Sequence, residues 1–142
     1  MYNTDLETWH FEDIPSFTIV LTPTVLSELD SLKVNHHNEQ VREKAEKLIR
    51  QIKEYGRRGD LHEGAPLRRG ISSILAIATE PRMEVSLPWL DPGSKDDRFI
   101  ASVIEVMRAR SRSSVVAVTR DINVQNKAAF ARLPFVEPPE RV

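Results

Sequence analysis

Carboxylates are the side chains of this sequence that could carry out chemistry. Two adjacent aspartates, Asp96 and Asp97, open the apolar run "SKDDRFIASVIEVM" at residues 94–107. Glu28 lies in "TPTVLSELDSL", and Asp121 directly follows "SVVAVT". The chain has no cysteine, which excludes disulfides, thiolate zinc sites and cysteine nucleophiles. A group of carboxylates suits a hard cation such as Mg²⁺ or Mn²⁺, which can activate water for the displacement at a phosphodiester.

Helical spacing separates these acids from the others in the chain. Glu28 lies three residues after Val25 and four before Leu32, so the three side chains share one apolar face. Asp96 opens an apolar stripe that continues at helical spacing through Phe99, Ile100, Val103 and Met107. Asp97 lies on the flank of that stripe. Helical phase therefore favours Asp96 as the inward-facing acid, with Asp97 as the competing choice.

Each acid also has a purely structural interpretation. Asp121 is well placed to act only as a helix N-cap. Asp96 and Asp97 could be first-turn acids that complement the helix dipole, and Glu28 could form a buried ion pair with a lysine or arginine. These alternatives stay open as long as each acid is considered alone.

Strands and helices alternate along the chain in the predicted secondary structure. The predicted strands are residues 17–21, 71–79 and 114–119, and the tail 134–142 can hold one short edge strand. The predicted helices are residues 22–32, 38–58, 95–110 and 121–133, with 57–70 as a glycine-rich, basic connection. This alternation predicts an α/β fold with a mostly parallel sheet. In such sheets the functional crevice lies outside the carboxyl ends of the strands, so the acids near those ends are expected to meet there.

Composition narrows the classes of protein that the chain can belong to. Its length of 142 residues suits a single domain, residues 1–142. Apolar residues make up 40% and charged residues 29%, which is ordinary for a globular domain. The net charge of -1 gives no global positive field of the kind that attracts nucleic acid. Because no apolar stretch approaches ~20 residues and the N-terminus does not resemble a secretory signal, we expect a cytoplasmic protein without membrane contact.

The sequence resembles the PIN-domain family of ribonucleases, in the bacterial branch with long helices after the second strand. The matching pieces are "VLTPTVLSELDSLK", "VREKA", "SKDDRFIA" and "VTRDINVQNKAA". They cover most of the chain from about Ile19 to Ala129, in the order and spacing of the family. The resemblance implies a three-layer α/β sandwich with a mostly parallel central sheet, whose acids bind Mg²⁺ or Mn²⁺ for the hydrolysis of RNA.

The resemblance assigns roles to individual residues. Glu28 and Asp121 correspond to the family's motif acids, and Asp96 matches the middle acid, with Asp97 as the alternative ligand. Thr119 and Asn123 match positions whose polar side chains support the acidic site. Apart from the resemblance, Arg120 and Lys127 lie near the proposed crevice and are expected to bind substrate phosphate, with Lys33 as a further candidate.

The family pattern begins with an apolar strand that ends in an aspartate, followed by Thr or Ser and then Asn. The chain opens at "MYNTDLETWHF", which resembles the segment that follows this motif, and Asp5 is not counted as the missing ligand. Two explanations are open: Met1 is an internal start of a longer protein, or the domain has lost its first strand. In both, one acidic ligand is absent from this sequence.

We therefore expect a Mg²⁺- or Mn²⁺-dependent endoribonuclease that cleaves single-stranded RNA, with Glu28, Asp96 and Asp121 as catalytic residues. The missing acid motivates the alternative, a catalytically inactive PIN-like module that binds RNA or a protein. The resemblance also suggests a homodimer and a protein partner such as an antitoxin.

Overall fold

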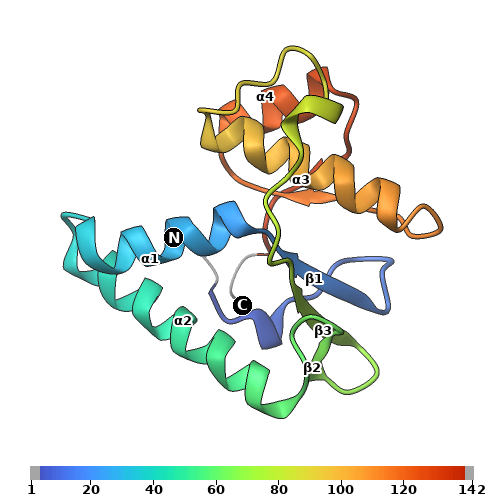
Figure 1. Cartoon of the computed structure of the whole chain (residues 1–142). Helices are drawn as coiled ribbons and strands as arrows, with labels where there is room; N and C mark the ends of the chain where they lie inside the picture. The colour runs from blue at the N-terminus through green and yellow to red at the C-terminus, as the bar shows by residue number, and fades with distance from the viewer. Residues whose placement is uncertain (1–3, 140–142) are drawn as a thin grey trace. The chain divides into compact units, whose positions relative to one another are not determined.

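The structure is a computed structural model that describes residues 4–139 (Figure 1). The chain divides into two compact units. Unit 1 runs to Ala78 and includes Pro139, and unit 2 comprises Thr79–Pro138.

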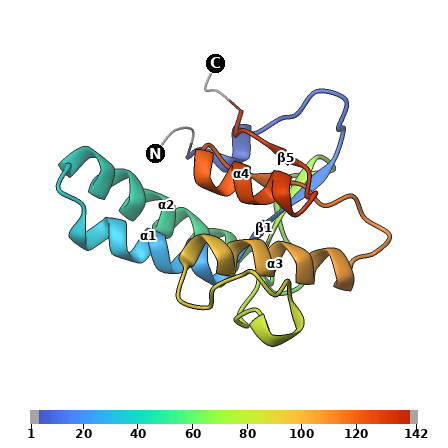
Figure 2. The ribbon, with the colours of Figure 1, turned by 90° about the horizontal axis from the view of Figure 1, so that it is seen from above.

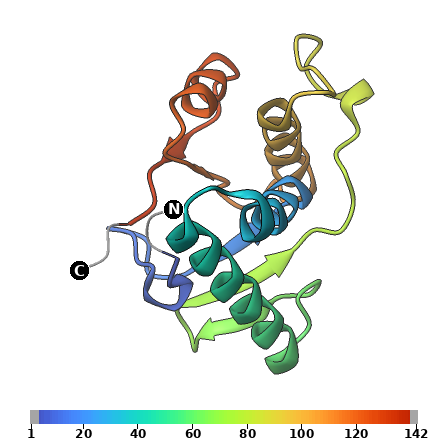
Figure 3. The same cartoon turned by 90° about the vertical axis from the view of Figure 1, so that its left-hand side faces the viewer.

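Unit 1 contains a helical hairpin and a three-stranded sheet. Its elements are the 3₁₀ helix η1 (Leu6–Thr8), β1 (Phe17–Leu21), α1 (Pro23–Asn35), α2 (Glu39–Arg58), β2 (Ala65–Arg68) and β3 (Ser72–Ala76). The sheet order is β1-β3-β2, with β1 parallel and β2 antiparallel to β3. Figures 1 and 3 show α1 and α2 side by side and α2 lying across the sheet.

The helices of unit 1 begin where the sequence supplies caps. The Thr22 hydroxyl accepts a hydrogen bond from the Val25 N–H at 3.4 Å, and Pro23 occupies the first turn of α1. Asn38 caps α2 in the same way. The buried side chains of α2 recur at helical spacing as Ala45, Leu48, Ile52 and Tyr55, so one face of this helix packs into the core.

Unit 2 contains two helices and a short parallel pair of strands. Its elements are the 3₁₀ helix η2 (Met83–Val85), α3 (Lys95–Ala109), β4 (Ala117–Val118), α4 (Ile122–Phe130) and β5 (Phe135–Val136). The core includes Ile100 and Ala101 of α3 and Ala128 of α4, each 0% exposed. Figure 2 shows α3 and α4 near each other. Each of these helices is capped at its start by a side chain, Ser94 for α3 and Asp121 for α4.

The structure confirms the α/β class, and two of its three strand pairings are parallel among the described residues. One predicted connection is wrong, because residues 57–70 include strand β2. Its side chains alternate between buried Ala65 and Leu67 and more exposed neighbours. Gly70, at φ +75°, lies in the tight turn to β3, a conformation that suits glycine. This four-residue strand was too short to show a period in the sequence.

The predicted strand 114–119 is also shorter in the structure, where only Ala117–Val118 pair with β5. The apolar residues Val115 and Val116 did not produce pairing, because a strand is defined by a neighbouring backbone that the sequence does not reveal. Across residues 4–139, every helix is too short or too polar to cross a membrane.

Candidate functional site

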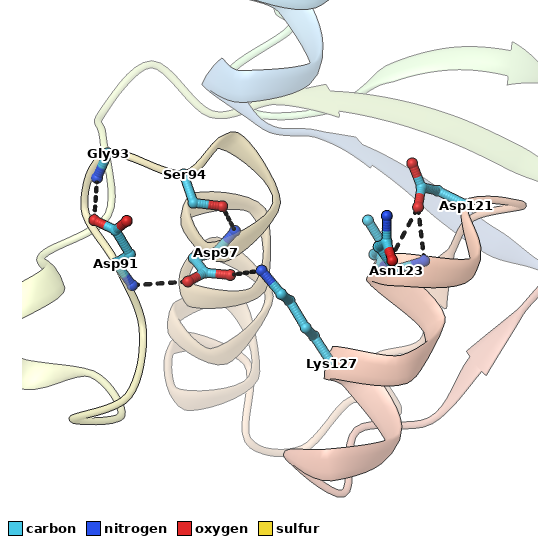
Figure 4. Close-up of polar contacts among 8 residues, drawn as sticks. Asp91, Gly93, Ser94, Asp97, Asp121, Asn123 and Lys127 are labelled. Atoms are coloured by element: carbon cyan, nitrogen blue, oxygen red, sulfur yellow. Dashed lines mark hydrogen bonds and ion pairs between the residues drawn. The ribbon is translucent and has the colours of Figure 1, made fainter.

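Asp97, in the first turn of α3, is a buried acid, 4% exposed. Its Oδ2 accepts a hydrogen bond from the Asp91 N–H at 2.8 Å. Its Oδ1 accepts one from the Lys127 ammonium, which extends from α4 to α3 (Figure 4). Both carboxylate oxygens therefore have partners, which offsets the cost of removing a charged group from water.

The loop before α3 holds the N–H group that binds Asp97. The Asp91 carboxylate accepts a hydrogen bond from the Gly93 N–H at 2.8 Å, and the Asp91 carbonyl accepts one from the Ser94 N–H at 3.1 Å. The Ser94 hydroxyl then caps α3 by accepting from the Asp97 N–H at 3.2 Å. These three bonds close a compact turn, so the Asp91 N–H points at Asp97 (Figure 4).

Electrostatics stabilise the charged forms of both partners. Burial acts to raise the pKa of Asp97, but the hydrogen bonds from Lys127 and the Asp91 backbone outweigh burial and lower the pKa below its ordinary value. The pKa of Lys127 is raised, first by its hydrogen bond to Asp97, against a smaller opposing effect of burial, and also by the charges of Asp96 and Asp91. The site is thus a paired carboxylate and ammonium at neutral pH.

Helical phase ranked the two adjacent aspartates in the wrong order of burial. Asp97 is buried, whereas Asp96 is partly exposed and its side chain makes no direct hydrogen bond among residues 4–139. The buried face of α3 includes the small residues Ala101 and Ser102, which an alignment of large apolar side chains overlooks. Because Ala101 and Ser102 are buried, the packed face of α3 extends to the side of the helix that carries Asp97. The metal-ligand role of either acid stays a prediction.

Asp121 lies at the start of α4 and caps it. Its Oδ1 accepts hydrogen bonds from the N–H groups of Asn123 at 2.8 Å and Val124 at 3.3 Å. The Thr119 hydroxyl accepts one from the Asp121 N–H at 3.1 Å. The structural alternative considered for Asp121 is therefore present, and so is an exposed carboxylate whose Oδ2 has no hydrogen-bond partner among the described side chains. Asp121 is thus contacted by the Thr119 hydroxyl and by the backbone N–H of Asn123, and the supporting role of these two side chains stays a prediction.

The remaining predicted residues lie elsewhere. Glu28 is in α1 of unit 1 and is exposed, while its neighbour Leu29 is 7% exposed. The expectation that Glu28 lies on the buried apolar face is therefore wrong, because α1 turns Leu29 inward. The Lys33 ammonium, also in α1, lies 3.7 Å from Oδ1 of Asp30. Arg120 is partly buried in unit 2.

The carboxylate oxygens of Asp97 and Asp121 can be compared with the ligands that a divalent cation requires. Asp97 supplies a hard oxygen, and this oxygen already faces a positive charge, the Lys127 ammonium. Asp121 supplies an exposed oxygen of the same chemical type. In the part of the chain that the structure describes, however, no three acidic or histidine side chains come close enough together to hold a metal ion. The donor chemistry fits Mg²⁺ or Mn²⁺, whereas the ligand set in this arrangement is incomplete.

The Asp97–Lys127 pair and the Asp91 N–H were not predicted from the sequence. One local signal pointed toward Asp97: Ser94 and Asp97 have the Ser-x-x-Asp spacing of a capping box, and Ser94 is indeed the cap. The contact with Lys127 joins residues 30 positions apart, a separation for which local patterns carry no information.

Comparison with known proteins places the chain in a family. A family model described as a PIN domain matches residues 7–137, a span that covers most of both units and includes every predicted site residue. No curated protein and no solved structure gives a significant match. The acids Glu28, Asp97 and Asp121 therefore lie within a matched domain whose fold is nuclease-like, and the chain belongs to the PIN-domain family.

Proposed function

We propose that this protein is a metal-dependent endoribonuclease that hydrolyses phosphodiester bonds of single-stranded RNA. Two findings support the proposal. The chain belongs to the PIN-domain family, and unit 2 contains a buried carboxylate with a lowered pKa at the start of α3. Buried acids with shifted pKa values are concentrated at functional sites. The burial and lowered pKa of Asp97 are therefore the observation on which the proposal rests.

The proposed ligands of Mg²⁺ or Mn²⁺ in unit 2 are Asp97, with its neighbour Asp96 as the alternative, and Asp121. Glu28 of unit 1 is proposed as a ligand from the family resemblance alone. When bound, the ion supplies a water of lowered pKa and stabilises the leaving oxygen. The residues of this chain contribute negative oxygens on the first turn of α3 and at the cap of α4. Asp97 is charged at neutral pH because its hydrogen bonds favour the carboxylate.

Cations of the chain would then bind the backbone of RNA, because the phosphates dominate the affinity for nucleic acids. Arg120 is adjacent in sequence to Asp121, and Lys127 lies on the same helix, α4. Lys33 of α1 is the third proposed phosphate ligand. Thr119 and Asn123 are proposed to orient Asp121, and the N–H of Asn123 contacts its carboxylate.

The experiment is a cleavage assay with a labelled single-stranded RNA in Mg²⁺ or Mn²⁺, repeated after chelation of the metal. The informative variant is Asp121→Asn, because asparagine is also a good N-cap and keeps an oxygen for the N–H groups of Asn123 and Val124. Cleavage by the native protein and its loss in a folded Asp121→Asn variant are expected. Equal cleavage by the two proteins would refute the assignment of Asp121.

A second candidate function is a catalytically inactive module that binds RNA or a protein partner. It is favoured by the pairing of Asp97 with Lys127 and by the incomplete ligand set among residues 4–139. Measurable binding of RNA together with no cleavage and no thermal stabilisation by Mn²⁺ would select this function. A homodimer and an antitoxin-like partner are proposed from the family resemblance, and size-exclusion chromatography with light scattering tests the first.

A further inference from the structure

Lys127 is the cation that contacts Asp97 in this structure. Its ammonium binds Oδ1 of Asp97, while the Asp91 N–H binds Oδ2. The Asp97 side chain is 6% exposed and that of Lys127 is 32% exposed. The charge of the buried acid is thus compensated by a residue of the chain itself.

This pairing conflicts with a simple metal site at Asp97. A divalent ion that takes Oδ1 as a ligand must occupy the region next to that oxygen, where the ammonium now lies. Two cations at one carboxylate oxygen also repel each other strongly in a partly buried site. Metal binding at Oδ1 of Asp97 therefore competes with the Lys127–Asp97 pair.

The negative charges of Asp96 and Asp91 also attract the ammonium of Lys127. Asp96 lies on the same turn of α3 as Asp97, and Asp91 supplies the N–H that binds Asp97. The surrounding acids thus favour a cation here, and the chain supplies one. From these contacts we infer that Lys127 acts as an internal substitute for a metal ion at Asp97 and lowers the affinity of this site for divalent cations.

This role deepens the proposed function and rests on it, because it concerns the same carboxylate. It differs from direct phosphate binding by Lys127, since the lysine here acts through Asp97. The size of the effect depends on the fraction of molecules in which Asp97 is not paired with Lys127. If this fraction is about a tenth, the measured metal affinity is about tenfold weaker than that of the unpaired site.

The test is a calorimetric titration of the full chain with MnCl₂, which requires no activity. Lys127→Met removes the competing charge and is expected to tighten Mn²⁺ binding about tenfold. Lys127→Arg keeps the charge and should retain the weak affinity of the native protein. Lys127→Gln keeps a hydrogen-bond donor without the charge, so it provides the same test if the methionine variant does not fold.

Two controls locate the effect. Lys95→Met removes one positive charge from an exposed position at the start of the same helix, α3, and should leave the Mn²⁺ affinity unchanged. The double variant Lys127→Met with Asp97→Asn should lose the gain in affinity, because the competed ligand is gone.

Equal Mn²⁺ affinity in the native protein, Lys127→Met and Lys127→Gln would overturn the inference. An equal gain in Mn²⁺ affinity in Lys95→Met would also overturn the inference, since that result would reveal a general effect of net charge. Absence of Mn²⁺ binding to all variants would also overturn it. Cleavage of RNA by the native protein, measured in parallel, reports separately on the proposed function and can succeed when the inference fails.

Discussion

The carboxylate of Asp97 and the ammonium of Lys127 form an ion pair that joins the first turn of α3 to the second turn of α4. Asp97 contributes a buried side chain, and Lys127 reaches it from a partly exposed position. The pair is a polar contact between α3 and α4, so it combines a structural role with a position in the candidate site.

Asp97→Asn should lower the free energy of unfolding by about 1–3 kcal/mol, because it leaves the Lys127 ammonium without its charged partner. Asp96→Asn is the matched control: Asp96 is the adjacent, more exposed acid, and its side chain makes no direct hydrogen bond among the described residues. Its effect should stay within about 0.5 kcal/mol. Urea denaturation of the three proteins measures both values. A larger loss in Asp96→Asn would contradict the burial order found here.

The same pair predicts a dependence of stability on pH. The pKa of Asp97 is lowered on folding, so its contribution is present above its ordinary value of 3.8 and is lost as the pH falls through the lower folded value. The stability difference between the native protein and Asp97→Asn should therefore narrow below about pH 4. Denaturation at pH 7, 4 and 3 measures this difference, and a constant gap would rule out the ionised pair.

The contribution of Asp121 as a helix cap can be separated from the contribution of its charge by two substitutions. Asp121→Ala should cost about 1 kcal/mol, because the N–H groups of Asn123 and Val124 lose their acceptor. Asp121→Asn should keep nearly all of the stability, while removing the charge on which the proposed cleavage depends. Thermal denaturation of the two variants compares them. Equal destabilisation by asparagine and alanine would show that the cap contacts at Oδ1 contribute little.

Tyr55 in α2 gives a prediction at alkaline pH. Burial, followed by the nearby charges of Glu7 and Asp5, raises its pKa from 10.0 to about 12. Because the folded state keeps the proton longer, Tyr55 contributes stability that is complete below pH 10 and is lost as the pH rises toward 12. At pH 11 the native protein should have lost about 1 kcal/mol through this group. Tyr55→Phe should lack that part of the alkaline decline when both proteins are denatured at pH 9 and pH 11.

The expectation of one domain can be tested through the two cores. Ile74 of unit 1 and Ile100 of unit 2 are both 0% exposed, and replacing either by alanine should cost about 2–5 kcal/mol. If residues 1–142 fold as one domain, as we propose, each substitution should move a single calorimetric transition. Two transitions, of which each variant moves a different one, would show that the units unfold independently.

The sequence alone determined the features that depend on local spacing. The capped starts of α1 and α4, the long amphipathic α2 and the α/β class follow from side chains a few residues apart, because caps and helix faces are set within one or two turns. The acids Glu28, Asp96 (with Asp97 as the alternative) and Asp121 were proposed from the same local patterns, and the resemblance of the sequence pieces indicated the family to which the chain belongs.

Tertiary structure decided which of these side chains is buried and which group it contacts. Asp97 rather than Asp96 turns inward because Ala101 and Ser102 widen the packed face of α3, and Leu29 rather than Glu28 is buried in α1. Lys127 reaches Asp97 across 30 residues of sequence, and β2 exists because β3 pairs with it. Helical phase limits the choice of an inward-facing residue to neighbours about 100° apart, and only packing against another element selects one of them.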